Sequence, residues 1–198
     1  MIAGLEEITS GELWIDGQLC NYVEAKDRDL SMVFQNYALY PNMTVYENMA
    51  FSLKIRKQPK DEVDKKVHEA AKMLGIEHLL DRRPAALSGG QKQRLTIARA
   101  LVKKPEILIL DDSASALDFA TDAALRKSLN RLDWKVTTFL VSQRSSSIQQ
   151  ADLILVLDNG TLAGKGTHAE LLRTCDTYRE IYFSQFPEER ARYSSVST

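Results

Sequence analysis

The sequence predicts an α/β fold in which helices cover a mostly parallel sheet. Three apolar runs in its second half, 107–110, 136–141 and 153–157, are separated by segments with a helical pattern. Such runs are typical of strands buried on both faces, and their alternation with helices favours parallel pairing. A further strand is expected at 29–34, followed by a helical stretch from 37 to 83. We therefore expect a sheet together with a separate group of helices.

Length and composition limit the class of protein. The 198 residues suffice for one domain, or one domain with a subdomain, and for a sizeable core. The net charge is −1 and the basic residues are dispersed, so no nucleic-acid partner is expected. Cys20 and Cys175 are isolated, as in proteins whose thiols stay reduced. No apolar run is long enough to span a bilayer, so a role at a membrane requires a partner.

Local signals place the first elements of the chain. A strand ends in the turn Asp16-Gly17, a dipeptide typical of β-hairpins. Thr44 and Glu47 have the spacing of a capping box, which predicts that a helix begins after them. A second helix follows, with Asp61 as its expected N-cap and Gly75 at its end.

Similar signals occur near the C-terminus. The pair Asn159-Gly160 predicts a hairpin turn after the third apolar run. Thr167 with Glu170 predicts another capping box, opening a final helix that reaches Tyr182. Residues 187–198 are charged and rich in serine, so we expect a mobile tail.

The stretch Leu87–Gln91 carries the clearest chemical signal. Gly89 and Gly90 follow Ser88 and precede a helical pattern. Glycine leaves the backbone bare, so that a phosphate can approach closely. The unpaired N–H groups and positive dipole end of a helix N-terminus attract anions, and Ser88 adds a hydroxyl donor. By themselves, these five residues also fit an ordinary glycine-rich loop before a surface helix.

Motifs on both sides make the interpretation of this stretch specific. Gln35 follows an apolar strand upstream, Asp111 and Asp112 end an apolar strand downstream, and Asp118 comes shortly after them. In this order and spacing the chain resembles the nucleotide-binding domain of ATP-binding-cassette (ABC) transporters, with its Q-loop, signature motif, Walker B strand and D-loop. The resemblance covers almost the whole chain.

The resemblance implies a P-loop NTPase-like (RecA-like) fold with an inserted helical subdomain. It assigns residues 1–35 to the N-terminal part of the α/β core and 36–90 to the helical subdomain, which ends in the signature motif. Residues 91–186 form the C-terminal part of the core, and 187–198 form the tail.

The family couples ATP hydrolysis, with Mg²⁺ as the metal, to solute transport. Two such domains pair head to tail, so each ATP lies between the P-loop of one and the signature motif, here Ser88–Gln91, of the other. The resemblance implies that Asp111 holds Mg²⁺ and that Gln35 contacts Mg²⁺ or the attacking water. Asp118 matches the residue that crosses the dimer interface.

Two positions depart from the family pattern. Asp112 stands where a glutamate usually polarises the attacking water, and Gln143 where a histidine usually contacts the γ-phosphate. The shorter Asp112 places a base differently, and Gln143 cannot carry a positive charge. These changes resemble the weakened sites of heterodimeric exporters and predict poor hydrolysis. Neutral change in an active enzyme is the alternative.

The P-loop pattern G-x-x-x-x-G-K-S/T does not occur in the sequence. The nearest match, 160–167, is one residue short and has Gly166 where Ser or Thr should follow Lys165, so a hairpin explains it better. We expect a chain truncated upstream, a sheet that lacks the P-loop strand, and weak or absent ATP binding by the chain alone. We also expect Ile107 and Ile109 to lie beside an empty sheet edge.

The resemblance changes along the chain. Up to about Lys104 the sequence is similar to the ATPase subunits of sugar importers, whereas from Asp111 to Tyr182 it is similar to multidrug-type exporters, so the direction of transport stays open. In the family, the surface matching 37–41 receives the membrane subunit. The implied partners are a second nucleotide-binding domain and transmembrane subunits, at the cytoplasmic, inner face of the cell membrane.

The sequence leaves two alternatives to a transporter ATP-binding domain. One is a non-catalytic interaction module that supplies the signature motif in trans. The other is a soluble ABC-type ATPase, against which the importer-like segment 37–41 argues.

Overall fold

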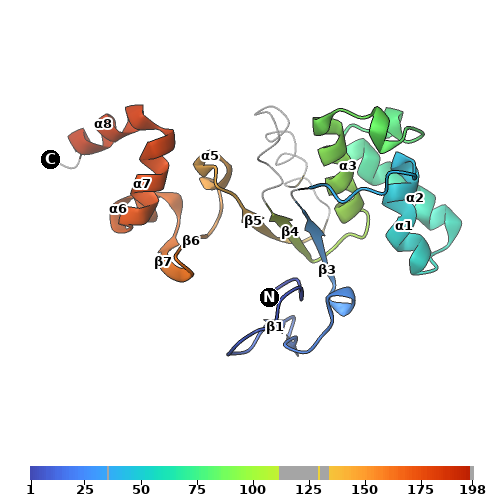
Figure 1. Cartoon of the computed structure of the whole chain (residues 1–198), viewed down its shortest axis with the longest axis horizontal. Coiled ribbons are helices and arrows are strands. Elements are labelled where there is room, and N and C mark those ends of the chain that lie inside the picture. Colours follow the sequence, from blue (N-terminus) through green and yellow to red (C-terminus); the bar gives the residue numbers. More distant parts are fainter. Residues whose placement is uncertain (35, 112–128, 130–133, 197–198) are drawn as a thin grey trace. The chain divides into compact units, whose positions relative to one another are not determined.

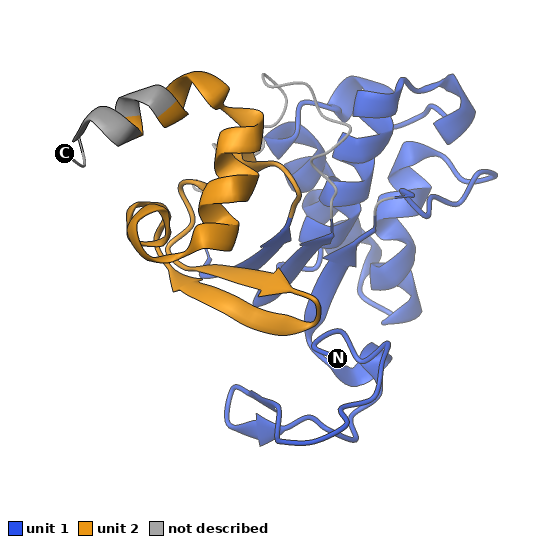
Figure 2. Ribbon diagram, turned by 60° about the vertical axis from the view of Figure 1, so that its left-hand side comes forward, with its two compact units in different colours: residues 1–141 blue, residues 142–198 orange. Residues whose placement is uncertain are grey.

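The structure, a computed structural model, describes residues 1–34, 36–111, 129 and 134–196. The chain forms two compact units, residues 1–141 and residues 142–198, which Figure 2 shows in different colours. The four-part division by subdomain stays a prediction.

A parallel sheet lies at the centre of the first unit. The strands β3 (Leu30–Val33), β4 (Ile107–Asp111) and β5 (Thr137–Val141) follow one another in that order across the sheet (Figure 1). Leu108 and Leu110 of the central strand are buried. The predicted α/β fold with a parallel sheet is confirmed.

The expected empty edge beside β4 is wrong. Ile107 lies opposite Leu30 on one side and opposite Thr137 on the other, and Ile109 is likewise paired on both sides. β4 is therefore the middle strand of the three, because β5, the next strand along the chain, pairs with its second edge.

The exposed strand is β5. In the part of the chain that the structure describes, β5 has a partner on one side only. Phe139 is 37% exposed and Val141 is 54% exposed, so the prediction that 136–141 is a fully buried strand is wrong. Apolar composition indicated a strand correctly, but burial of its side chains also needs other elements that cover each face of the sheet.

Three helices pack together in the first unit, and the last of them along the chain also packs against β3. They are α1 (Val45–Ile55), α2 (Lys60–Met73) and α3 (Gly89–Leu101), with the 3-10 turns η2 (Glu77–Leu79) and η3 (Pro84–Ala86) between α2 and α3 (Figure 1). Side chains from the three helices and from β4 share one core. Its fully buried members include Val45, Met49, Leu53, Val67, Leu95, Ile97, Leu101 and Leu108.

The helix boundaries follow the local signals with one exception. Thr44 caps α1 in a full capping box, in which its Oγ1 accepts from the Glu47 amide at 3.1 Å and its amide donates to the Glu47 carboxylate at 2.7 Å. Pro59, not Asp61, is the N-cap residue of α2, because a proline there loses no helical hydrogen bond. Asp61 lies in the first turn, and Gly75 follows the helix at φ 65°.

The N-terminal segment contains a small hairpin. Strands β1 (Trp14–Ile15) and β2 (Gln18–Leu19) pair antiparallel, and the 3-10 turn η1 (Ala25–Asp27) follows them. Asp16 and Gly17 have φ values of 48° and 74°, which confirms the predicted turn.

A buried arginine ties this segment together. Arg28 is 6% exposed and donates to four backbone carbonyls. The distances are 2.6 Å to Met1, 2.7 Å to Ile2, 2.8 Å to Cys20 and 3.0 Å to Val23. A buried charge needs such partners, so Arg28 holds the first residues of the chain against the segment that leads into β3.

The second unit contains an antiparallel hairpin and several helices. Its described elements are α5 (Ser145–Ile148), β6 (Ile154–Asp158), β7 (Thr161–Gly166), α6 (His168–Thr174), α7 (Asp176–Gln185) and α8 (Pro187–Val196). β6 pairs with β7 around Asn159 and Gly160, both at positive φ, which confirms the predicted hairpin turn. Ile154 and Val156 are buried while Leu155 and Leu157 are exposed, so the expectation of a strand buried on both faces is wrong here.

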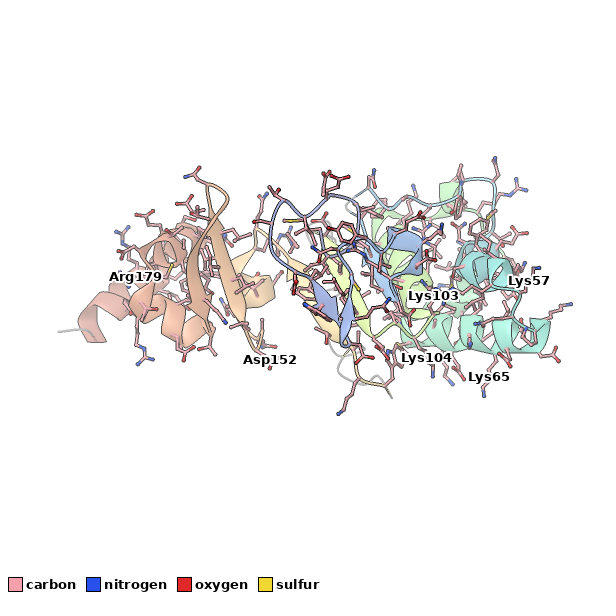
Figure 3. The ribbon with its side chains drawn as sticks, turned by 90° about the horizontal axis from the view of Figure 1, so that it is seen from below. Lys57, Lys65, Lys103, Lys104, Asp152 and Arg179 are labelled. Carbon is pink, nitrogen blue, oxygen red and sulfur yellow. The ribbon has the colours of Figure 1, made fainter. Side chains whose placement is uncertain are left out.

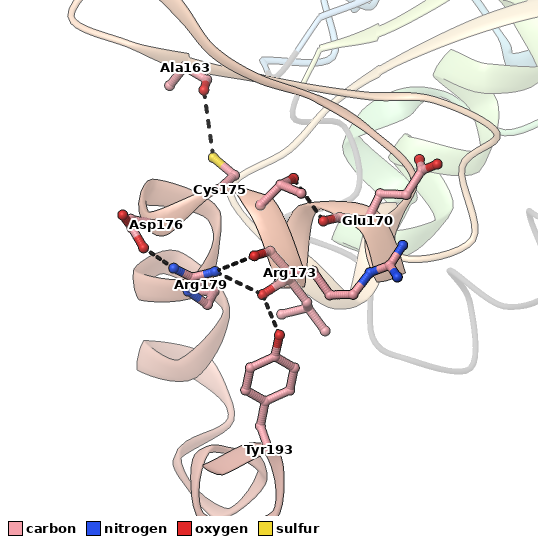
Figure 4. A network of polar contacts seen from close by, with 9 residues as sticks. Ala163, Glu170, Arg173, Cys175, Asp176, Arg179 and Tyr193 are labelled. Atoms are coloured by element: carbon pink, nitrogen blue, oxygen red, sulfur yellow. Dashed lines mark hydrogen bonds and ion pairs between the residues drawn. The ribbon is translucent and has the colours of Figure 1, made fainter. Parts of the chain in front are cut away.

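The C-terminal region is helical beyond the expected final helix. The expected capping box of Thr167 and Glu170 opens α6, and the chain is extended at Cys175 before α7 begins. Arg179 of α7 donates to the Leu172 carbonyl at 3.1 Å (Figure 4). The expected tail includes α8, where the Tyr193 hydroxyl donates to the same carbonyl at 2.7 Å, so part of this tail packs against the unit.

We predict that Gly164→Ala destabilises the second unit. An added Cβ would lie 2.7 Å from the Cys175 sulfur and 3.0 Å from Leu171 Cδ2, and both of these side chains are buried. Overpacking of this kind costs about 1–3 kcal/mol of the free energy of unfolding, measurable by urea titration. The double variant with Cys175→Ala removes the closest contact and is expected to recover part of the loss. Equal stability of wild type and Gly164→Ala would contradict the close packing.

Candidate functional site

The glycine-rich stretch forms the start of α3, as the sequence predicts. Ser88 is the N-cap, its Oγ accepting from the Gln91 amide at 3.4 Å. The Gln91 side chain accepts from the Ser88 amide at 2.9 Å, which completes a capping box. The amides of Gly89 and Gly90 belong to the first turn, whose N–H groups have no partner within a helix.

Space for a ligand exists directly over these glycines. An added Cβ on Gly90 would have no neighbour within 4 Å, and one on Gly89 would have only the Tyr37 hydroxyl, at 3.9 Å. Ser88 and Gly89 are exposed. An anion can therefore approach the bare backbone at the positive end of the helix.

The loop after β3 lies against the same helix in an unusual conformation. Tyr37 and Ala38 have φ values of 61° and 44°, which side-chain-bearing residues adopt at a cost. Arg99 of α3 donates to the Ala38 carbonyl at 2.6 Å and to the Tyr37 carbonyl at 3.0 Å. Its guanidinium also lies 5.8 Å from the centre of the Tyr40 ring, at cation–π distance. Arg99 therefore holds two strained residues in place.

Two further side chains support this loop. The Thr96 hydroxyl lies 2.9 Å from the Lys92 carbonyl, to which it donates, and 3.4 Å from the Tyr37 carbonyl. The Asn48 side chain accepts from the Tyr40 amide at 2.9 Å and donates to the Tyr40 carbonyl at 3.1 Å.

Burial has an electrostatic cost at this contact. It lowers the pKa of the Arg99 guanidinium. We did not predict Arg99, Thr96 or Asn48 from the sequence. Thr96 and Arg99 do have the spacing of one helix face, but nothing local shows that the loop of residues 37–40 covers that face.

The other predicted site residues are only partly placed by the structure. Asp111 is half-buried at the carboxyl end of β4, opposite Val141 of β5. Gln35, Asp112 and Asp118 lie outside the described residues. Among the residues that are described, no three His, Cys, Asp or Glu side chains converge as a metal site. Asp111 is thus the one predicted metal ligand whose position is known.

Gln143 lies in the second unit. Its side chain is exposed, and its backbone carbonyl accepts from the Gln185 side chain at 2.8 Å. Helix α7 thereby fixes the backbone at this position, while the side-chain amide stays accessible to solvent.

Comparison with known proteins identifies the family. Residues 1–115 match the family model described as "ABC transporter". The chain belongs to the ABC transporter family. The match spans the glycine-rich stretch, the strand β4 and the loop of residues 37–40, so the order of motifs in the sequence indicated the family correctly.

Named relatives agree with this assignment. The "sn-glycerol-3-phosphate import ATP-binding protein UgpC" of Psychromonas ingrahamii is 45% identical, over 86% of this chain and 47% of its own length. The "Oligosaccharides import ATP-binding protein MsmX" of Bacillus subtilis is also 45% identical, over 84% of this chain and 47% of its own length. This chain spans about half the length of the curated relatives that it matches.

A solved structure shows the same fold. The chain superposes on a structure titled "Structure of a bacterial Atm1-family ABC exporter with ATP bound" with a TM-score of 0.77 and 34% identity, covering 89% of this chain and 32% of the other. The P-loop NTPase fold of ABC ATPases is therefore confirmed. In the described residues, no helix is both long and apolar enough to cross a bilayer.

We predict that Arg99→Ala releases the loop of residues 37–40. The carbonyls of Tyr37 and Ala38 would lose their charged donor, at a cost of about 1–3 kcal/mol of unfolding free energy. Hydrogen–deuterium exchange of the amides of residues 38–40 should become faster. Arg83→Ala, at an exposed arginine, is the matched control and should change neither quantity. Unchanged exchange in the Arg99 variant would show that other contacts hold the loop.

Proposed function

We propose that this chain forms part of the ATP-binding region of an ABC transporter and supplies the signature side of a composite ATP site. The proposal rests on the geometry at the start of α3. There Ser88 caps the helix while Gly89 and Gly90 present an open backbone to an anion. A triphosphate held by the P-loop of a second nucleotide-binding domain would meet these groups at the shared interface.

During phosphoryl transfer, hydrogen-bond donors and cations stabilise the negative charge on the transferred phosphoryl group. In the proposed site the Ser88 hydroxyl and the first-turn amides of α3 contact the γ-phosphate. Asp111 and Gln35 belong to the other composite site of the pair, on its P-loop side, where they would hold Mg²⁺, which would supply positive charge against the phosphates when bound. Asp112 orients the attacking water less effectively than a longer glutamate, and Gln143 adds a hydrogen bond without a positive charge. We therefore propose slow hydrolysis.

The proposed partners meet this chain at two places. A second nucleotide-binding domain faces the start of α3 and Asp118, and a transmembrane subunit faces the loop of residues 37–41 in the helical subdomain. Arg99 supports this arrangement, because it joins that loop to the helix that begins at Ser88. The chain then works at the cytoplasmic, inner face of the membrane.

A second candidate is a non-catalytic module that supplies the signature motif in trans and binds no nucleotide alone. The start of α3 favours it, because Ser88, Gly89 and Gly90 form an open helix N-terminus and such a module needs no more than this. Calorimetry of the chain with Mg-ATP separates the two. Measurable heat of binding by the chain alone supports an ATP-binding domain in its own right, and no heat supports the module.

The signature role predicts a specific effect of charge at Gly90. An aspartate there would place a carboxylate where the phosphate approaches, so Gly90→Asp should weaken nucleotide-dependent pairing at least about tenfold. The assay is sedimentation of the chain mixed with a P-loop-bearing ABC ATP-binding domain and the Mg²⁺ complex of a non-hydrolysable ATP analogue.

Ala85→Asp is the matched control, since it adds the same charge at an exposed position just before the motif. It should pair like wild type. Pairing that is equally strong in the Gly90 variant, or that does not depend on nucleotide, would contradict the proposed role.

A further inference from the structure

A surface pocket lies at the opposite end of α3 from the glycine-rich stretch. Its volume is about 220 Å³. Ala70 of α2 and the pair Leu101 and Val102 at the end of α3 contribute its buried apolar surface, and Trp134 contributes an aromatic wall. The 13 residues of α3 place it roughly 20 Å from Ser88 along the helix.

The indole nitrogen of Trp134 already has a hydrogen-bond partner within the protein. Its indole Nε1 donates to the Pro105 carbonyl at 3.1 Å, and its ring packs against the core of the unit. The indole therefore offers apolar ring surface to the pocket and no unmet donor.

The rim of the pocket is positively charged. Lys66 and Lys104 line it, together with the carboxylate of Glu69. That carboxylate lies 4.0 Å from Lys65 and 4.0 Å from Lys104. Figure 3 labels Lys65, which belongs to α2, and Lys104, which follows α3. Two ammonium groups thus lie at this carboxylate, and Lys66 brings a further positive charge to the lining.

The two lysines of the lining are placed by contacts of their own. Lys66 Nζ donates to the Gln58 side chain at 2.9 Å. Lys104 Nζ lies 5.2 Å from the centre of the Trp134 ring, at cation–π distance. An acidic group bound between them would therefore meet cations that lie beside apolar surface, where charge-assisted hydrogen bonds are strong.

We propose that this pocket binds a small aromatic acid. Its ring would pack on Ala70, Leu101 and Trp134, and its acidic group would contact Lys66 and Lys104. The volume is below the range of about 300–1,000 Å³ typical of drug-sized ligands, so it suits one or two rings. A free phosphate would leave the apolar floor unused, and a neutral hydrocarbon would make no contact with the ammonium groups of the lining.

The test uses 3-phenylpropionate as the probe and 3-phenylpropionamide as its neutral analogue. In a Trp14→Phe background, fluorescence reports on Trp134 alone, because the chain has two tryptophans. The carboxylate is expected to change the emission saturably, and the amide to bind at least about tenfold more weakly, as for loss of a charged hydrogen bond. Inorganic phosphate is expected to cause no change.

Two variants test separately how the apolar floor of the pocket and the lysines at its rim contribute to binding. Lys104→Met should weaken binding of the acid at least about tenfold without changing that of the amide. Ala70→Leu fills the floor and should abolish binding of both. Lys57→Met, at an exposed lysine outside the lining, is the control and should bind like wild type.

Thermal melts show whether each variant is folded. If Ala70→Leu does not fold, Lys104→Met still tests the proposal. The proposal is overturned if the acid does not bind, if acid and amide bind equally, or if Lys104→Met binds like wild type. None of these measurements involves ATP, so the outcome is independent of the function proposed above.

Discussion

The contact between Arg99 and the carbonyls of Tyr37 and Ala38 is the interaction on which the arrangement of the first unit depends most. It joins residues about sixty positions apart and holds two of them at positive φ, a conformation that a free loop would leave. The same helix begins at Ser88 and packs its apolar face into the core shared with β4. One helix therefore carries the glycine-rich turn, the support of the loop and part of the core.

What the sequence predicted well depends on neighbours in the chain. The capping boxes at Thr44 and Thr167 and the turns at Asp16-Gly17 and Asn159-Gly160 all form as expected. Each requires residues only one to three positions apart, so the pattern alone contains the physical cause. The order of the motifs identified the family for a similar reason, since spacing along the chain is directly visible.

The errors concern contacts between distant segments. The sequence indicates that 107–110 and 136–141 are strands, but not which of them has two neighbours, so the exposed edge was assigned to β4 instead of β5. Arg99 was missed because its partners come from a loop that folds onto its face of the helix. The helix α8 was missed because the composition of 187–198 is polar, while the Tyr193 hydrogen bond joins it to a carbonyl 21 positions earlier.

The central claim is that the start of α3 contacts the phosphates of a nucleotide. Its most direct test is hydrogen–deuterium exchange of the amides of residues 88–91, in the presence of a P-loop-bearing ABC ATP-binding domain, with and without the Mg²⁺ complex of a non-hydrolysable ATP analogue. We predict that exchange of these amides slows only when the nucleotide is present. Pairing of the two domains on nucleotide with unchanged exchange at residues 88–91 would contradict the account.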